Sequence, residues 1–254
     1  MNIALLLSGG TGTRLGESVP KQYLEVNGKK IISYSLETLL CSDSIDALQI
    51  VASEQWRDAV RVEIEQILSD ISEKLLLTDS EHAVEKFNRI KNKFRGFSAP
   101  GENRQLSILS GLESCKSYAG DNDIILVHDA ARPFVSEELI ERILTAASEH
   151  DGAMPVLPMK DTVYLSEDGK AVSKLLQREK IFAGQAPEAF KLGKYFNATR
   201  ALLPNRILTI NGATEPAVMA GMDIAMVEGD ERNFKVTTKA DLERMNEIVR
   251  DMRE

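Results

Sequence analysis

Cysteine is scarce in this 254-residue chain, which contains only Cys41 and Cys115, and their spacing is not that of a metal site. Both lie in apolar segments, so we expect small buried side chains and neither a disulfide nor a metal centre. No apolar run reaches the roughly 18 residues that a membrane-spanning helix requires, so no membrane span is predicted. The N-terminus lacks the basic start and small-residue cleavage site of a secretory signal, which favours a cytoplasmic protein.

Basic residues are outnumbered, with 31 Lys and Arg against 39 Asp and Glu, and the net charge is −8. This balance argues against nucleic acid or an anionic membrane as a partner. Hydrophobic residues make up 43% of the chain, which is enough to bury a substantial core. The length is most simply that of one α/β domain over residues 1–254. Cations that gather within short motifs are therefore expected to have local roles.

Short apolar runs separated by helical patterns indicate the fold class. Strands are predicted at residues 3–7, 48–52, 124–127 and 153–156. Helices are predicted at 31–40, 105–116 and 136–148, with Ser136 as the last N-cap, and a closing helix begins at Thr238 with Asp241 in its first turn. This alternation is typical of a mostly parallel sheet, in which nucleotides bind beyond the carboxyl ends of the strands. The loops after Leu7 and Val127 should meet there.

A glycine-rich loop follows the first strand and is the most informative motif of the chain. It contains Ser8, Gly9, Gly10, Gly12, Thr13, Arg14 and Gly16, and the segment Pro20-Lys21-Gln22 comes shortly after. Glycines allow backbone N–H groups to turn toward an anion, while Arg14 and Lys21 supply positive charge. The loop therefore predicts a binding site for a triphosphate.

Two common phosphate-binding motifs do not fit this loop. The spacing of Gly10, Gly12 and Gly16 is not the G-x-G-x-x-G of dinucleotide-binding folds, and no Gly-Lys-Ser/Thr of a P-loop follows. A dinucleotide-dependent oxidoreductase would also need an acidic residue ending the second strand, whereas Glu37 falls inside a predicted helix. A surface turn with incidental charges and a nucleotide-sensing module without catalytic activity remain as alternatives.

Asp129 ends a predicted buried strand, where a carboxylate needs a cationic partner. Mg²⁺ is one candidate, because it is commonly held by one or two carboxylates together with substrate phosphates. A structural ion pair with Arg132 is the alternative. Strand alternation turns the neighbouring His128 to the opposite face, which favours a hydrogen-bonded core histidine. Asp230 and Glu231 offer either a further metal contact or a solvated turn.

Five motifs occur in an order that resembles one enzyme family. After the glycine-rich loop come Gly101-Glu102-Asn103-Arg104-Gln105 with Ser107, then His128-Asp129-Ala130-Ala131-Arg132-Pro133, then Asp161-Thr162 with Arg178, and finally Asn233-Phe234-Lys235. From residue 2 to about residue 249 the chain resembles the cytidylyltransferases that act on small polyol phosphates. The resemblance implies a Rossmann-like three-layer α/β nucleotidyltransferase fold, with a mostly parallel central sheet and a projecting β-arm. It also implies transfer of CMP from CTP to a polyol phosphate with release of pyrophosphate, and Mg²⁺ as the cofactor.

The same resemblance implies a role for each motif residue. The nucleotide is expected to contact Ser8, Gly9, Gly10, Gly12, Thr13, Gly101, Arg104 and Ser107. The expected catalytic cations are Arg14, Lys21 and Lys235, and the expected metal ligand is Asp129. The acceptor is expected to contact Arg132, Asp161, Thr162 and Arg178. A surface charge at a helix start is the alternative for Arg104, and the residues alone do not decide between CTP and UTP.

Residues 157–184 are expected to form a dimerisation arm. Apolar residues from Val163 to Leu175 surround a turn at Asp168-Gly169, which is typical of a two-stranded hairpin. The resemblance implies an arm that embraces a second subunit, and an isolated hairpin is marginally stable, so we expect a homodimer whose active sites are shared between subunits. Residues 69–95 form a second distinctive stretch, an insertion relative to the family, for which peripheral helices are expected. Trp56 and His82, near and within it, are expected to be packing and surface residues.

Two departures from the family pattern bear on the acceptor. Gln185-Ala186-Pro187-Glu188 stands where the 2-C-methyl-D-erythritol 4-phosphate enzymes typically have Gln-Thr-Pro-Gln, and residues 211–215 replace a typical Thr-Asp-Asp or Thr-Asp-Glu. Ser8-Gly9-Gly10 and Gly184-Gln185 are similar to the ribitol 5-phosphate branch, whereas the 128–133 string is closer to the methylerythritol branch. We expect 2-C-methyl-D-erythritol 4-phosphate as the acceptor, in isoprenoid precursor biosynthesis. Ribitol 5-phosphate, converted to CDP-ribitol for cell-wall or capsule polymers, is the alternative.

Overall fold

The computed structural model describes residues 1–10, 19–76 and 81–252. In this part of the chain eight strands form one sheet, in the order β10-β7-β11-β6-β1-β4-β5 with β12 paired to β7. The strands are β1 (Asn2–Leu7), β4 (Ala47–Val51), β5 (Phe94–Ser98), β6 (Ile124–Asp129), β7 (Gly152–Pro158), β10 (Phe182–Gly184), β11 (Glu188–Lys191) and β12 (Ile224–Glu228). β1 runs parallel to β4 and β6, whereas β10 and β11 run antiparallel to their neighbours. The sheet is mixed and mostly parallel, as the sequence predicts.

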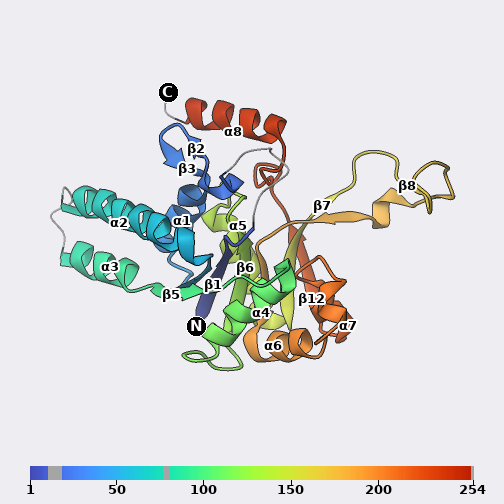
Figure 1. Cartoon of the computed structure of the whole chain (residues 1–254), viewed down its shortest axis with the longest axis horizontal. Coiled ribbons are helices and arrows are strands. Elements are labelled where there is room, and N and C mark those ends of the chain that lie inside the picture. The colour runs from blue at the N-terminus through green and yellow to red at the C-terminus, as the bar shows by residue number, and fades with distance from the viewer. Residues whose placement is uncertain (11–18, 77–80, 253–254) are drawn as a thin grey trace.

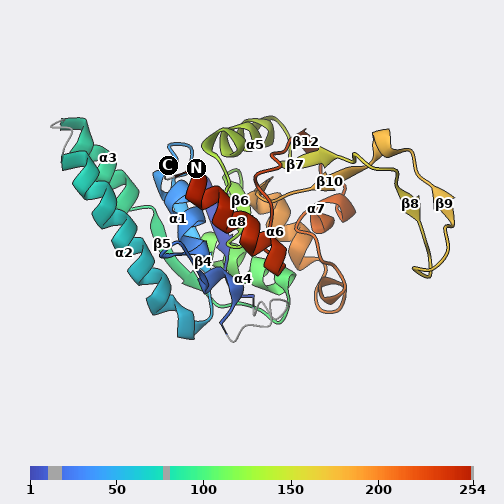
Figure 2. The same ribbon diagram turned by 90° about the horizontal axis from the view of Figure 1, so that it is seen from above.

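Helices cover both faces of the sheet and give the three layers seen in Figure 1. One face is covered by α1 (Ile31–Cys41), α2 (Glu54–Leu76), α3 (Glu81–Lys91) and α5 (Glu137–Glu149), and the other by α4 (Arg104–Cys115), α6 (Leu192–Arg200) and α7 (Glu215–Met219). A further helix, α8 (Lys239–Asp251), packs on the small hairpin of β2 (Glu25–Val26) and β3 (Lys29–Lys30). Figure 2 shows the α2–α3 pair and the arm at opposite ends of the molecule.

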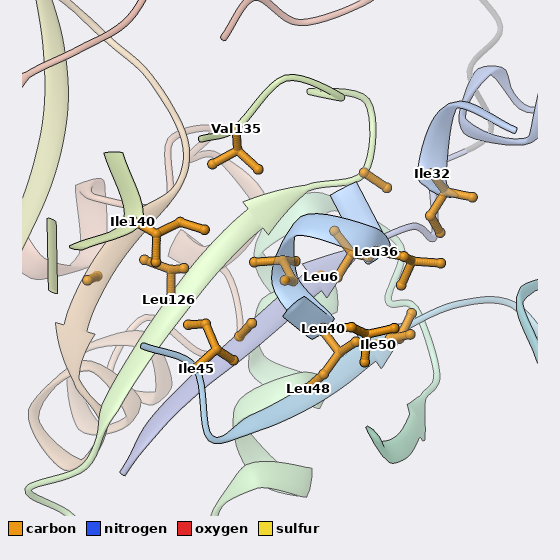
Figure 3. Close-up of a cluster of buried hydrophobic side chains, with 14 of the residues drawn as sticks. Leu6, Ile32, Leu36, Leu40, Ile45, Leu48, Ile50, Leu126, Val135 and Ile140 are labelled. Carbon is orange, nitrogen blue, oxygen red and sulfur yellow. The ribbon is translucent and has the colours of Figure 1, made fainter. Parts of the chain in front are cut away.

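The alternation of side chains along β1 explains why both faces need a helical layer. Leu6 faces the α1 side of the sheet and Leu5 faces the α4 side, and both are fully buried. Figure 3 shows Leu6 in a cluster with Leu36 of α1 and Ile50 of β4. Strands buried on both faces read as continuous apolar runs, which is the pattern that the central strands show in the sequence.

The predicted helix starts are confirmed. Ser136 caps α5 by accepting a hydrogen bond from the Leu139 amide at 3.2 Å. Thr238 and Asp241 form a reciprocal capping box at the start of α8. The sequence does not predict β5, β10, β11 or β12, because these strands are short and all four contain half-buried or exposed positions.

The predicted arm and peripheral helices are both present. A short antiparallel ladder of β8 (Tyr164–Leu165) and β9 (Lys174–Leu175) lies in the arm, and Gly169 between them has a φ of 70°. Within residues 69–95 the chain forms the end of α2 and α3. No helix in the described residues is long and apolar enough to cross a membrane. Cys115 is buried and Cys41 half-buried, both as free thiols.

Candidate active site

A cavity of about 430 Å³ opens at the carboxyl ends of β1 and β6. Its lining brings together most of the residues that the sequence predicts for nucleotide binding and catalysis. They are Gly9, Gly10, Lys21, Gly101, Arg104, Ser107, Asp129 and Lys235. Leu7, Gln22, Glu102, Asn103 and Ala131 complete the wall. Segments more than 200 residues apart in the sequence, from Lys21 to Lys235, therefore meet at one site.

The start of the glycine-rich loop forms one wall of this cavity. Gly9 approaches Pro100 so closely that a Cβ at position 9 would collide with the proline ring. A Cβ built on Gly10 would have no heavy atom within 4 Å outside its chain neighbours. Glycine at position 9 is thus required where the two nucleotide loops touch. The remaining predicted loop residues, Gly12, Thr13 and Arg14, lie outside the described residues.

Ser8 lies beneath the loop, and its side chain does not line the cavity. Its hydroxyl donates to the Tyr23 hydroxyl at 2.7 Å, and its amide donates to the Val51 carbonyl at 2.8 Å. The Ser8 side chain is therefore not placed to contact a nucleotide in the cavity. Ser8 is instead the residue through which the loop is attached to the underlying structure.

The short helix η2 (Lys21–Tyr23) supports the loop from below. Lys21 Nζ lies 2.6 Å from the Val236 carbonyl, which ties η2 to the segment that carries Lys235. The Gln22 side-chain amide donates to the carbonyls of Ser8 and Gly10, each at 2.8 Å. A single buried glutamine thus fixes two of the loop's peptide groups.

The second loop leads into α4 and forms the opposite wall. Asn103 caps the helix by accepting from the Leu106 amide at 2.8 Å. Ser107 Oγ accepts from the Gly101 amide at 3.0 Å and donates to the Asn103 carbonyl at 2.9 Å. A Cβ at Gly101 would collide with Leu106, so this position needs glycine.

Asp129 lies at the centre of an ion cluster and is 8% exposed. One carboxylate oxygen lies 3.2 Å from Arg104 Nη2, and the other lies 2.8 Å from Lys235 Nζ. Burial alone would raise the pKa of Asp129, but the two cations outweigh burial and hold it well below its ordinary value. Asp129 is therefore a carboxylate at neutral pH. Its predicted alternative partner was Arg132, and the observed ion pairs are with Arg104 and Lys235 instead.

Arg104 is not a surface charge at a helix start, so that alternative is wrong. It forms ion pairs with both Asp129 and Glu188, the latter at 3.6 Å. The predicted strand alternation for His128 is confirmed, because His128 is fully buried on the other face of β6 and its ring lies 3.1 Å from the Arg132 carbonyl. Burial lowers the pKa of His128 to about 4, so the ring is neutral at pH 7 and has a structural role.

Two buried residues behind the cavity were not singled out from the sequence. Glu188, at the start of β11, is 8% exposed and lies beside Arg104 and the Thr214 hydroxyl. Burial raises the pKa of Glu188 to about 7. Asn233 is fully buried, donates to the Ala186 carbonyl at 2.7 Å, and accepts from Arg132 through its own carbonyl. Both lie in motifs noted in the sequence, but the burial that gives them importance comes only from the fold.

The predicted acceptor residues are divided between two places. Arg132 follows Ala131, which lines the cavity, but Arg132 does not line it, and its guanidinium donates to the Asn233 carbonyl at 2.7 Å. Thr162 and Arg178 line a separate cavity of about 480 Å³ on the arm, and Asp161 is exposed. Within one chain the arm residues therefore do not share a cavity with Asp129.

Asp230 and Glu231 form ion pairs with Arg232 and Lys160 in an exposed turn, as the solvated-turn alternative predicts. The described residues contain no cluster of three or more acidic, histidine or cysteine side chains that could hold a metal ion by itself.

The position of the cavity defines the class of protein. A glycine-containing loop, a second loop at a helix start and a carboxylate between two cations meet at the carboxyl edge of a mostly parallel sheet. This is the arrangement of a nucleotidyltransferase.

Comparison with known proteins identifies the family. The family model for 2-C-methyl-D-erythritol 4-phosphate cytidylyltransferase (IspD) matches residues 2–251. The chain belongs to this family and is a cytidylyltransferase.

Relatives with two different acceptors are similar to the chain over nearly its whole length. The 2-C-methyl-D-erythritol 4-phosphate cytidylyltransferase of Thermotoga neapolitana is 36% identical over 251 residues, covering 99% of this chain and 98% of that protein. The ribitol-5-phosphate cytidylyltransferase of Streptococcus agalactiae serotype III is 30% identical over 242 residues, covering 95% and 92%. The crystal structure of 4-diphosphocytidyl-2C-methyl-D-erythritol synthase from Anaerococcus prevotii has a TM-score of 0.76 at 21% identity, covering 98% and 96%, and supports the fold.

Proposed function

We propose that this enzyme transfers CMP from CTP to 2-C-methyl-D-erythritol 4-phosphate and releases pyrophosphate. The observation that carries the proposal is the single cavity in which Gly9 and Gly10 face Lys21, Arg104 and Lys235 around Asp129. Such a site can surround a triphosphate with backbone donors and cations. Nucleotidyl transfer depends mainly on positioning and electrostatic stabilisation, so these groups suffice without a covalent enzyme intermediate.

The reaction is a substitution at the α-phosphorus of CTP. An oxygen of the acceptor phosphate forms a bond to this phosphorus, and the bond between the phosphorus and the oxygen bridging to the β-phosphate breaks. Pyrophosphate leaves with the electron pair of the broken bond. Lys21, together with Arg14, stabilises the negative charge that grows on the leaving group, and Lys235 contacts the α-phosphate or the attacking phosphate.

The donor set in the cavity fits Mg²⁺, and Asp129 would hold it. Asp129 is ionised, lines the cavity and supplies oxygen ligands, and Mg²⁺ is usually bound by one or two carboxylates with substrate phosphates. When bound, the ion neutralises phosphate charge. Arg104 and Lys235 form ion pairs with the same carboxylate.

The cytidine is proposed to lie against the second loop. Gly101, Ser107 and Arg104 line the cavity beside the start of α4, where backbone amides, a hydroxyl and a guanidinium can pair with a cytosine carbonyl and ribose hydroxyls. The choice of CTP over UTP follows from the family to which the chain belongs.

We propose a homodimer in which the arm of each subunit completes the site of the other. Thr162 and Arg178 line the arm cavity and not the cavity that contains Asp129, so one chain does not gather the acceptor contacts. Exposed apolar side chains support an arm that needs a partner, since Tyr164 is 57% and Leu175 60% exposed. A cytoplasmic location is part of the same proposal.

Two acceptors are candidates, and the proposal favours one of them. Methylerythritol phosphate is supported by the higher identity to the Thermotoga neapolitana enzyme. Ribitol 5-phosphate is the second candidate, supported by the Streptococcus agalactiae relative and by Ala186, which lacks the hydroxyl of the usual Thr. The Thr214 hydroxyl donates to Glu188 at 3.3 Å and Glu188 pairs with Arg104, so we expect this segment to affect an acceptor indirectly.

A pyrophosphate-release assay tests the proposal. CTP and UTP are each combined with 2-C-methyl-D-erythritol 4-phosphate, ribitol 5-phosphate and related polyol phosphates, with and without Mg²⁺. We expect release with CTP, methylerythritol phosphate and Mg²⁺ together, and little release when any one is omitted. Binding of CTP without release in any combination would support the nucleotide-sensing alternative.

A further inference from the structure

We propose that Trp56 is a positioning residue for Ser8, Gly9 and Gly10 at the start of the nucleotide-binding loop, and that it acts through Tyr23. The inference rests on the proposed CTP site, to which it adds a residue that does not line the cavity. Trp56 stands in the first turn of α2, directly after the carboxyl end of β4. It is the single tryptophan of the chain, which gives the proposal a spectroscopic test.

The first link is a stacked aromatic pair. The Trp56 and Tyr23 ring centroids are 4.4 Å apart, and the ring planes differ by 14°. Tyr23 is only 3% exposed, and Trp56 packs on the same core cluster as Leu6 and Ile50. Stacking buries apolar surface and also fixes the plane of the tyrosine ring. The position of the Tyr23 hydroxyl therefore depends on a side chain of α2.

The second link joins Tyr23 to the loop by two hydrogen bonds. The Tyr23 hydroxyl accepts from Ser8 Oγ at 2.7 Å and donates to the Ser8 carbonyl at 3.1 Å. Ser8 directly precedes Gly9 and Gly10, which line the cavity. Gln22 holds the Ser8 and Gly10 carbonyls from the same short helix. These bonds hold the Ser8 and Gly10 carbonyls against η2.

Preorganisation is the expected effect of this arrangement. A glycine-rich loop without support must become ordered when the nucleotide binds. The conformational entropy lost in this ordering makes the binding free energy less favourable. Loss of a stacked aromatic pair should therefore weaken CTP binding roughly three- to tenfold. The proposed action of Trp56 is on the loop, whereas Lys21 and Lys235 are proposed to stabilise the transition state, so kcat should change less than KM.

Steady-state kinetics of Trp56→Ala, Trp56→Phe and Tyr23→Phe test the proposal. We expect KM for CTP to rise roughly three- to tenfold in Trp56→Ala, and Trp56→Phe to restore most of the loss because it keeps a ring on Tyr23. Tyr23→Phe removes both hydrogen bonds to Ser8 by deletion of one oxygen and should raise KM similarly. Its small change in volume keeps the test valid if Trp56→Ala folds poorly.

Phe94→Ala is the matched control. Phe94 packs on the same core cluster as Trp56, but it lies at the start of β5, at the opposite end of the strand from the site. We expect this variant to lower Tm while KM for CTP stays within twofold of the unmodified enzyme. The double variant Trp56→Ala with Tyr23→Phe should raise KM no further than either single change, because both act through Ser8.

Tryptophan fluorescence gives an independent readout. CTP titrated into the unmodified enzyme should change the emission of Trp56 in a saturable way, and Tyr23→Phe should reduce the amplitude. An enzyme that turns over CTP normally, yet shows unchanged KM in both Trp56→Ala and Tyr23→Phe, would overturn the inference. An unmodified enzyme without CTP turnover on any polyol phosphate would instead overturn the proposed function.

Discussion

Glu188 is a buried carboxylate whose ionisation is expected to oppose folding, and this expectation can be measured. Burial raises the pKa of Glu188 from 4.5 to about 7, although Arg104 lies 3.6 Å away and partly offsets the effect. Between these two pH values the folded protein keeps a proton that the unfolded chain has lost. Stability contributed by the protonated carboxyl is therefore present at acidic pH and is lost as pH rises toward 7.

The magnitude follows from proton linkage. Each pH unit in this window lowers the free energy of unfolding by about 1.4 kcal/mol, so the loss between pH 4.5 and pH 7 is about 3 kcal/mol. Glu188→Gln keeps the shape of the side chain and removes the titration. The free energy of unfolding of Glu188→Gln, relative to that of the unmodified enzyme, should therefore rise by about 3 kcal/mol from pH 4.5 to pH 8. For a chain of this length the matching change in Tm is roughly 6 to 12 °C.

Urea unfolding and thermal melts of both proteins at several pH values between 4.5 and 8 measure this difference. Glu247→Gln, an exposed position on α8, is the matched control and should stay within about 0.5 kcal/mol of the unmodified enzyme at every pH. A difference for Glu188→Gln that does not change with pH, or that grows toward acidic pH, would refute the argument. It would mean that Arg104 stabilises the ionised form of Glu188 more than burial opposes it.

Three further predictions concern the site. Asp129→Asn should abolish Mg²⁺-dependent turnover and lower the free energy of unfolding by about 1–3 kcal/mol, since Arg104 and Lys235 lose their partner; near-normal activity at saturating CTP would place the metal site elsewhere. Lys21→Ala should lower kcat as well as kcat/KM, each by roughly 100-fold, because charge grows on the leaving group; an effect confined to KM for CTP would make Lys21 a ground-state contact. Arg178→Lys should raise the acceptor KM roughly tenfold and leave KM for CTP within about twofold, since lysine lacks the bidentate fork. Mixing inactive variants of Arg178 and Lys21 should partly restore activity if sites are shared, and a mixture with exchanged subunits that stays inactive would show that each chain builds its own site.

The sequence predicts the central strands and the site motifs because both depend on local pattern. Buried parallel strands are continuous apolar runs, the glycine loop follows β1 directly, and Asp129 is the last residue of β6. The rule that such sheets bind ligands at their carboxyl edge then places these motifs together. The predicted opposite orientations of His128 and Asp129 follow from strand alternation and are confirmed.

Contacts between distant segments could not be predicted in this way. The alternative protein partner considered for Asp129 was Arg132, three residues away, whereas the observed ion pairs are with Arg104 at a helix start and with Lys235 near the C-terminus. Glu188 and Trp56 gain their importance from burial and stacking across the fold, which no local spacing reveals. The position of Ser8 beneath the loop follows from its contact with Tyr23, fifteen residues later.

A competition between the two candidate acceptors tests the central claim most directly. The enzyme is incubated with CTP, Mg²⁺ and equal concentrations of 2-C-methyl-D-erythritol 4-phosphate and ribitol 5-phosphate, and the early products are separated and weighed by mass spectrometry. The account predicts that the cytidine diphosphate conjugate of methylerythritol forms in large excess. Predominance of CDP-ribitol would contradict the proposed acceptor, and the absence of any cytidine diphosphate conjugate would contradict the proposed reaction.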